Sequence, residues 1–183
     1  MKSIGTRLEG VLIVEPTIFN DSRGWFMETY SIPKMAGIGI DVAFVQDNHS
    51  YSSVKNVIRG LHFQNSPMGQ SKLVRCSHGS ILDVAVDIRK GSPSYLEWVK
   101  IELSSENKRQ LFIPQGFAHG FVTLEDETEV QYKVDNVYSK EHDRSIRYDD
   151  SDIGIDWGVE EPIISDKDAK APRLSESDNN FEY

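Results

Sequence analysis

The chain has 183 residues, which is enough for one domain with a buried core, and it carries a net charge of −9 at pH 7. This charge argues against nucleic acid or an anionic membrane as a general partner, although local groups of Arg and Lys can still bind the phosphates of a nucleotide. A single cysteine, Cys76, excludes an intrachain disulfide and a thiolate metal cluster. The sequence shows no signal-peptide core and no apolar run of membrane-spanning length, so we expect a cytoplasmic protein.

Short segments rich in Val, Ile, Phe and Tyr are predicted to be β-strands, because turn residues separate them at regular spacing. In chain order these are residues 11–14, 25–30, 44–50, 57–63, 73–76, 81–88, 98–103, 110–113, 119–123 and 129–134. One short helix is predicted over 32–36, and the polar residues at about 175–183 are predicted to be a flexible tail. Because no repeat, linker or long helical period is found, the pattern indicates a single all-β domain over 1–183, built as a sandwich or barrel.

Alternation along three of these strands places polar side chains among apolar ones. Lys72 shares a strand face with Val74, and Tyr132 shares one with two valines. His119 lies on the same face as Phe121. Because burial of a lysine is costly without a partner, these residues could line the mouth of a jelly roll. The alternative is that Tyr132 is a core residue with a satisfied hydroxyl and that Lys72 extends into solvent.

The segment Arg-Gly-Leu-His-Phe-Gln at 59–64 places two functional side chains close together. His62 is the residue type that most often acts as a general base near neutral pH, and Arg59 is the type that binds phosphate with a planar fork. Gly60 between them permits a bulge that would break strict alternation. The alternative is a structural histidine beside a surface arginine.

Three further places carry candidate functional side chains. Gln46 and Asn48 end an apolar run, where they could contact a base edge or hydroxyl groups or could be an ordinary polar strand end. His119, in a segment rich in Gly and aromatic residues, could line a pocket or pack against Phe121. An aspartate of the segment 165–168 could reach back to a histidine and orient its ring, as the acid of a catalytic triad does, or the segment could be a charged tail.

The histidine spacing argues against a metal centre. The histidines are at positions 49, 62, 78, 119 and 142, and no pair has the H-x-H or H-x-x-x-H spacing. Phe63 and Gln64 follow His62, so the second histidine of the usual jelly-roll metal site is missing. We therefore predict no metal, although three distant histidines can in principle converge.

Taken together, these motifs resemble the dTDP-4-dehydrorhamnose 3,5-epimerase family of the cupin class. The matching stretches follow the family's order and cover nearly the whole chain: 21–28, 44–48, 59–64, 72–75, 83–89, 113–121, 132–133, 153–157 and 164–168. The resemblance implies an antiparallel cupin-type jelly roll with a few short helices that forms a homodimer by exchanging an N-terminal strand. It also implies a dTDP-4-dehydro-6-deoxyglucose substrate, no cofactor, and a place in dTDP-L-rhamnose biosynthesis.

The resemblance further implies roles for individual residues. His62 would be the catalytic base, Asp168 its orienting partner, and Tyr132 the acid on the opposite face of the sugar. Lys72 would bind the substrate and stabilise the enolate at O4, while Arg23 and Glu28 would reach into the neighbouring subunit's site. The other substrate-binding positions would be Gln46, Asp47, Asn48, Arg59, His119, Asp143 and Lys167.

Three other functions compete with this interpretation. A related enzyme could invert a single carbon of a similar nucleotide sugar, because pocket shape decides how long the intermediate stays bound. A non-catalytic sugar-binding jelly roll would be expected to lack the base or the acid, whereas His62, Asp168, Tyr132 and Lys72 are all present. A metal-dependent cupin would differ in the metal content of the purified protein.

Overall fold

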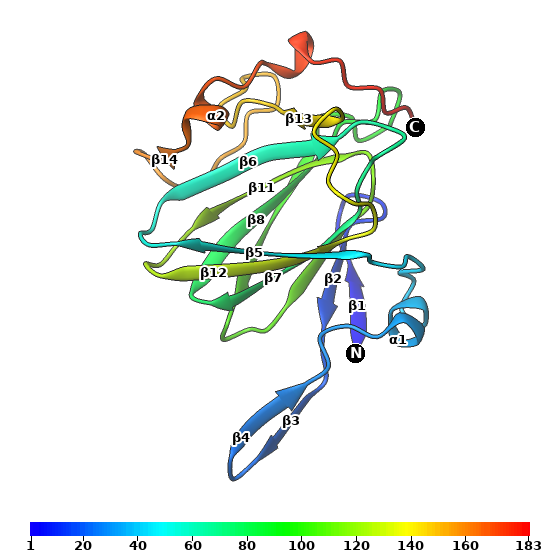
Figure 1. Ribbon diagram of the computed structural model, residues 1–183, viewed down its shortest axis with the longest axis vertical. Helices are drawn as coiled ribbons and strands as arrows, with labels where there is room; N and C mark the ends of the chain where they lie inside the picture. Colours follow the sequence, from blue (N-terminus) through cyan, green and yellow to red (C-terminus); the bar gives the residue numbers. More distant parts are fainter.

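The computed structural model describes residues 1–183 and contains two β-sheets that face each other (Figure 1). Sheet 1 has the strand order β1 (Lys2–Gly5), β2 (Leu12–Glu15), β10 (Gln110–Ile113), β7 (Lys72–His78), β12 (Thr128–Val134) and β5 (Gln46–Ser52). Sheet 2 has the order β13 (Asp143–Ser145), β6 (Val57–Gln64), β11 (Phe117–Thr123), β8 (Ser80–Asp87) and β9 (Trp98–Ser104). The short strand β14 (Ile163–Ile164) runs parallel to β6, and all other pairings between these strands are antiparallel.

Apolar side chains fill the space between the sheets and also cover their outer faces. Val74 and Val130 of sheet 1 belong to the same buried cluster as Ala85 and Phe121 of sheet 2. A second cluster lies on the outer face of sheet 2, where the segments after β13 contribute side chains such as Trp157. Burial on both faces explains why β8 and β11 do not alternate strictly between apolar and polar residues.

The outer face of sheet 1 is covered at one place by the helix α1 (Ile32–Ala36). Met35 of this helix is fully buried in a cluster with Leu73 and Phe112. Proline in the first turn is tolerated because its missing N–H would have no partner there. The predicted helix is therefore present, and its role is to cover the sheet.

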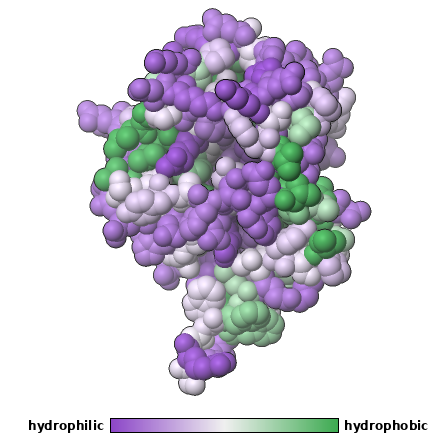
Figure 2. Space-filling model, in the orientation of Figure 1, coloured by the Kyte–Doolittle hydropathy of each residue, from purple (hydrophilic) through white to green (hydrophobic).

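The strands β3 (Ile18–Asp21) and β4 (Gly24–Met27) form a hairpin that projects away from the two sheets (Figure 1). Phe19, Trp25 and Phe26 of this hairpin are all more than half exposed. Figure 2 shows that its tip is hydrophilic and that the part nearer the body is more hydrophobic. The strand predicted over 25–30 ends at Met27, because the chain then turns into α1.

The all-β antiparallel fold class predicted from the sequence is confirmed, and the predicted dimer stays a prediction. Each predicted strand has a counterpart, with bounds that differ by a few residues. The structure adds the short elements β1, β3, β13 and β14, the helix α2 (Asp166–Ala169) and the 3-10 turn at Leu174–Glu176. No helix has both the length and the apolar character needed to cross a membrane.

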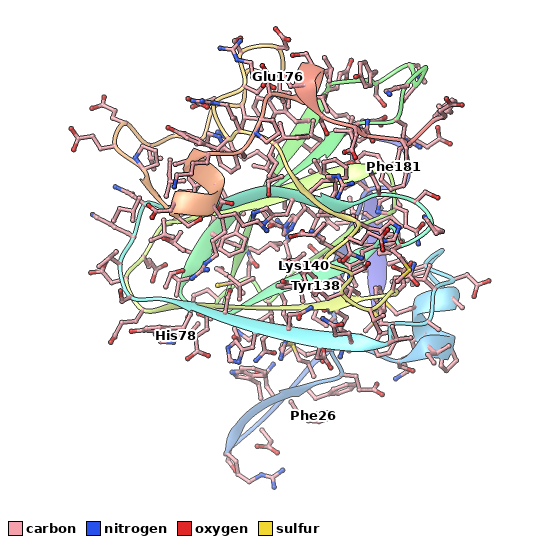
Figure 3. All side chains as sticks on the ribbon, turned by 45° about the horizontal axis from the view of Figure 1, so that its top comes forward. Phe26, His78, Tyr138, Lys140, Glu176 and Phe181 are labelled. Carbon is pink, nitrogen blue, oxygen red and sulfur yellow. The ribbon has the colours of Figure 1, made fainter.

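Residues 175–183 were predicted to be a flexible tail, but they lie against sheet 2 and its loops. Asn179 is buried and donates a hydrogen bond from Nδ2 to the carbonyl oxygen of Ile88 at 2.6 Å. The ring of Phe181, labelled in Figure 3, lies 6.4 Å from that of Phe63, centroid to centroid. Two of the polar residues that suggested a loose end, Asn179 and Asn180, therefore bind backbone carbonyls of the body.

The close approach of β6 and β11 depends on glycine at position 60. A Cβ atom there would lie 2.6 Å from Cα of Gly120 and 2.8 Å from the carbonyl oxygen of His119. We expect Gly60→Ala to lower the free energy of unfolding by at least about 2 kcal/mol, since overpacking and a strained φ of +130° act together. Urea denaturation measures this loss.

Gly24→Ala is the matched control for this variant. Gly24 has a φ of +132°, and no heavy atom lies within 4 Å of its would-be Cβ atom, so the control has similar backbone strain without the steric clash. We expect a smaller loss of stability in the control. Equal losses in the two variants would contradict the explanation.

Candidate functional site

A cleft of about 820 Å³ lies between the two sheets. Its walls come from β5, β7 and β12 of sheet 1, from β6 and β11 of sheet 2, and from the segment at 163–168. Most of the sequence-predicted site residues line it: Gln46, Asn48, Arg59, His62, Lys72, His119, Tyr132, Asp143, Lys167 and Asp168.

An extra residue in β6 decides which of its side chains face the cleft. His62 is opposite His119 on β11, and Arg59 is opposite Phe121, so three steps along β6 match two steps along β11. The bulge at Gly60 shifts the alternation, and Arg59 and His62 both line the cleft as a result. The bulge that the sequence suggested at Gly60 is therefore present.

The ring of His62 is held by the carboxylate of Asp168. Nε2 of His62 lies 2.7 Å from Oδ1 of Asp168, which is 4 % exposed. The hydroxyl of Ser165 caps α2 by accepting a hydrogen bond from the backbone N–H of Asp168 at 3.1 Å. A turn of polar residues near the end of the chain is thereby fixed in place beneath β6.

The protonation of this pair follows from its surroundings. Burial raises the pKa of Asp168, but the hydrogen bond from His62 and other favourable contacts outweigh burial and leave the pKa below its usual range. Asp168 is therefore an acceptor at neutral pH, and Nε2 of His62 carries the proton. With that proton on Nε2, Nδ1 is the ring nitrogen that is left to accept a proton, as a general base requires.

Lys72 extends from sheet 1 toward sheet 2 and is only 7 % exposed. Its Nζ lies 3.3 Å from the carbonyl oxygen of His62 and 3.5 Å from Nδ1 of His119. Burial lowers the pKa of Lys72 to about 8, and the negative charges of Asp83 and Asp143 partly oppose this change. The prediction that Lys72 is buried and lines the cleft is confirmed, and the alternative that it extends into solvent is wrong.

Tyr132 and His119 are both neutral at neutral pH. Burial raises the pKa of Tyr132, with the charge of Arg59 acting against it, so the phenol keeps its proton. Burial also lowers the pKa of His119. Nε2 of His119 is 2.7 Å from Oδ1 of Asp83, which is a second histidine–carboxylate pair. Sequence analysis missed Asp83, although an aspartate within the apolar strand 81–88 was a visible signal.

Polar groups surround the more open part of the cleft. Nζ of Lys167 lies 2.7 Å from Oδ2 of Asp143, and Nη2 of Arg59 donates to a backbone carbonyl. Tyr138 also lines the cleft, and sequence analysis did not single it out. Tyr138 follows β12, and in Figure 3 its label lies between the ribbons of β5 and β6. Other lining residues missed from the sequence include Gln64, Gln70 and Ser165.

Three of the predicted substrate-binding residues do not reach the cleft within one chain. Arg23 is exposed at the hairpin tip and pairs with Asp21, and Glu28 pairs with Lys34. Asp47 points to the other face of sheet 1, where it forms an ion pair with Lys133. Their proposed roles stay predictions, and those of Arg23 and Glu28 need a second subunit.

The site combines three chemical capacities in one cleft: a histidine with a free lone pair, a buried ammonium and a protonated phenol. No group of three or more His, Cys, Asp or Glu side chains has a geometry that could hold a metal ion. A base and an acid on facing sheets can move a proton onto or off a carbon, and a cation between them can stabilise an oxyanion.

Comparison with known proteins identifies a family to which the sequence is similar over nearly its whole length. The model of the dTDP-4-dehydrorhamnose 3,5-epimerase family matches residues 5–176. The dTDP-4-dehydrorhamnose 3,5-epimerase of Salmonella typhimurium is 53% identical over 176 residues, which cover 95% of this chain and 96% of that protein.

Solved structures of similar enzymes agree closely with this fold. The Bacillus anthracis dTDP-4-dehydrorhamnose 3,5-epimerase with TDP and PPi bound has a TM-score of 0.91 and 46% identity, covering 93% of this chain and 98% of that one. The Legionella pneumophila dTDP-6-deoxy-D-glucose-3,5-epimerase in complex with dTDP-4-keto-L-rhamnose has a TM-score of 0.91 and 45% identity, covering 96% and 94%.

The burial of Lys72 predicts an unusual titration. We expect its ammonium to lose its proton at about pH 8 instead of the ordinary lysine value of 10.5, because burial disfavours the charged form. A function that needs this cation is then present below about pH 8 and lost above it. Nitrogen-15 NMR of lysine-labelled protein follows the titration, and Lys72→Met identifies the signal by removing it. An ammonium signal for Lys72 that persists to the ordinary lysine range would contradict the prediction.

Proposed function

This chain belongs to the dTDP-4-dehydrorhamnose 3,5-epimerase family, and on this basis we propose that it converts dTDP-4-dehydro-6-deoxy-α-D-glucose to dTDP-4-dehydro-β-L-rhamnose. The reaction inverts C3 and C5 of the sugar. The observation that carries the proposal is the position of His62 and Tyr132 on facing sheets of one cleft, with the ammonium of Lys72 between the sheets.

The chemistry of the substrate explains why these residue types are needed. The C4 ketone acidifies the hydrogens on C3 and C5. Nδ1 of His62 removes one of these protons, and the electrons of the broken C–H bond form a double bond as charge moves onto O4. The ammonium of Lys72 donates a hydrogen bond to that oxygen, where the negative charge develops. The resulting enolate is flat at the reacting carbon, so a proton can return from either side.

Inversion requires that the proton return from the face opposite to the base. The hydroxyl of Tyr132 supplies it, and its raised pKa keeps the phenol protonated until it is used. Asp168 stabilises the imidazolium that His62 becomes after it takes the proton. Exchange with solvent then returns the proton to Tyr132 and removes the one held by His62, and the cycle repeats at the second carbon.

The open part of the cleft suits the nucleotide half of the substrate. Arg59 and Lys167 provide cations for the diphosphate. These local positive charges allow a protein of net charge −9 to bind a doubly negative ligand. The amides of Gln46 and Asn48 provide donors and acceptors for hydroxyl groups or a base edge. His119 and Asp143 complete the proposed binding set.

We also propose that the enzyme works as a homodimer in the cytoplasm. The exposed aromatic side chains of the β3–β4 hairpin form an apolar arm that a second subunit would cover. Arg23 and Glu28 on this arm would then enter the neighbour's cleft. The single buried cysteine, Cys76, suits a reducing compartment, since the fold requires no disulfide.

His62→Ala tests the proposed function directly. We expect the variant to form product at least about 100-fold more slowly than the wild type while still binding dTDP, because the base is lost and the binding groups remain. Proton NMR follows product formation, and calorimetry follows binding.

His78→Ala is the control, because His78 is exposed at the end of β7 and does not line the cleft. It should react at the wild-type rate. Full activity of His62→Ala would exclude His62 as the base, and a wild-type protein that binds the substrate without forming product would refute the proposed function.

A further inference from the structure

A carboxylate that the proposed reaction does not use lies fully buried behind the cleft. We propose that Asp83 is a positioning residue that holds the ring of His119 in one tautomer and thereby aims an N–H of Lys72 at the position of O4. The inference rests on the proposed function, because it concerns the cation that meets the developing oxyanion.

The environment of Asp83 is unusual for a buried carboxylate. The residue lies in the middle of β8, opposite Phe121 on one side and Ile101 on the other, and its exposure is 0 %. Its Oδ1 lies 2.7 Å from Nε2 of His119, while Oδ2 is buried without a hydrogen-bond partner. A buried polar atom without a partner is costly and calls for an explanation.

Asp87, four residues along the same strand, shows what a structural carboxylate looks like here. It is also 0 % exposed, but both of its oxygens accept hydrogen bonds. The donors are the guanidinium of Arg89 and the hydroxyls of Ser92 and Ser94. The charge of Asp87 is thus satisfied locally, whereas that of Asp83 is directed toward His119 and Lys72.

The hydrogen bond to Asp83 selects the tautomer of His119. A carboxylate accepts and cannot donate, so Nε2 of His119 carries the proton. The ring is neutral at neutral pH because burial lowers the pKa of His119. Nδ1 therefore has a free lone pair, and it lies 3.5 Å from Nζ of Lys72. In the other tautomer this position would carry an N–H that faces the ammonium and repels it.

This arrangement orients the ammonium of Lys72. An ammonium has three N–H donors. One is directed to the carbonyl oxygen of His62 at 3.3 Å, and a second to Nδ1 of His119 at 3.5 Å. The third N–H remains for an oxygen in the cleft. Because the first two acceptors belong to sheet 2, they hold the end of a long side chain that begins on sheet 1.

The charge of Asp83 acts in the same direction. Asp83 and Asp143 are the two carboxylates that raise the pKa of Lys72 against burial. Asp143 is already paired with Lys167, so Asp83 is the carboxylate free to compensate the buried cation. The ionisable groups that face Lys72 from the surrounding elements are Asp83 on β8, Asp143 on β13, His119 on β11, His62 and Arg59 on β6, Tyr132 on β12, and Asp168 and Lys167 on α2.

Asp83→Asn tests the inference, because the amide has the shape of the carboxylate without its charge. We expect kcat to fall at least about tenfold while KM changes little, the size of effect seen when the orienting partner of a functional side chain is removed. We also expect the alkaline limb of the kcat profile, near pH 8 in the wild type, to move to lower pH as Lys72 loses its proton more easily.

Asp87→Asn is the matched control, since it removes a buried carboxylate from the same strand outside the cleft. It should lower stability and leave the alkaline limb where it is in the wild type. The inference would be overturned if the alkaline limb of the kcat profile of Asp83→Asn lay at the same pH as that of the wild type. It would also be overturned if both variants shifted this limb equally. If the wild type itself forms no product, the proposed function fails, and a measurement without substrate decides the inference.

The measurement without substrate uses the wild-type protein, so it does not depend on whether a variant folds. Nitrogen-15 NMR of histidine-labelled wild-type protein distinguishes the two neutral tautomers of an imidazole. We expect His119 to be neutral with its proton on Nε2 across neutral pH. A proton on Nδ1, or a doubly protonated ring, would overturn the inference.

Discussion

The bulge in β6 at Gly60 is the constraint on which the rest of the site depends. In a regular strand, residues three apart point to opposite faces, so Arg59 and His62 could not line one cleft. One extra residue relative to β11 brings both to the same side. The space for this bulge comes from Gly120 on the neighbouring strand, because any side chain at position 60 would collide with its backbone. The backbone N–H of Gly60 also points toward Oδ2 of Asp168, at 3.4 Å, so the same bulge helps to place the partner of His62.

The two sheets contribute different kinds of groups to the cleft: proton acceptors from sheet 2 and proton donors from sheet 1. Sheet 2 carries the two histidines of the cleft, His62 and His119, each held at Nε2 by a buried carboxylate, so that each leaves Nδ1 free. Sheet 1 carries the two groups that hold protons at neutral pH, the ammonium of Lys72 and the phenol of Tyr132. Acceptors thus face donors across a space from which water is partly excluded, and in such a space electrostatic interactions are stronger than in water. The segment after β13 completes the site, since it supplies Asp168 and Lys167 and covers the outer face of sheet 2.

The fold class, the central strands and the main residues of the site could be predicted from the sequence, because each has a recognisable local pattern. Strands that are buried on at least one face have strong apolar patterns, so the central strands and the all-β class were visible. The family motifs then pointed to His62, Lys72, Tyr132 and Asp168 as one site, and the structure brings these residues into one cleft. Their catalytic roles stay proposals.

The features that were missed have tertiary causes. β13 has three residues and β14 has two, which is too short for a clear strand pattern in the sequence. Both strands form because they pair with β6. The last residues look like a tail because they are polar, yet Asn179 and Phe181 bind the body. Asp83 was part of a recognised motif, but its partner His119 is far away in sequence, and their pairing follows from the register of β8 and β11. Arg23 and Glu28 lie outside the cleft of their own chain, and the cleft that they are proposed to enter belongs to another subunit.

The central claim is that this cleft removes and returns a proton at both carbons next to the ketone. Incubation of the wild-type protein with dTDP-4-dehydro-6-deoxyglucose in heavy water, followed by proton NMR, tests it most directly. We expect deuterium to enter at C3 and at C5 while the product with the L-lyxo configuration accumulates. Deuterium at a single carbon would instead indicate a single-centre epimerase, and binding without exchange at either carbon would contradict the claim.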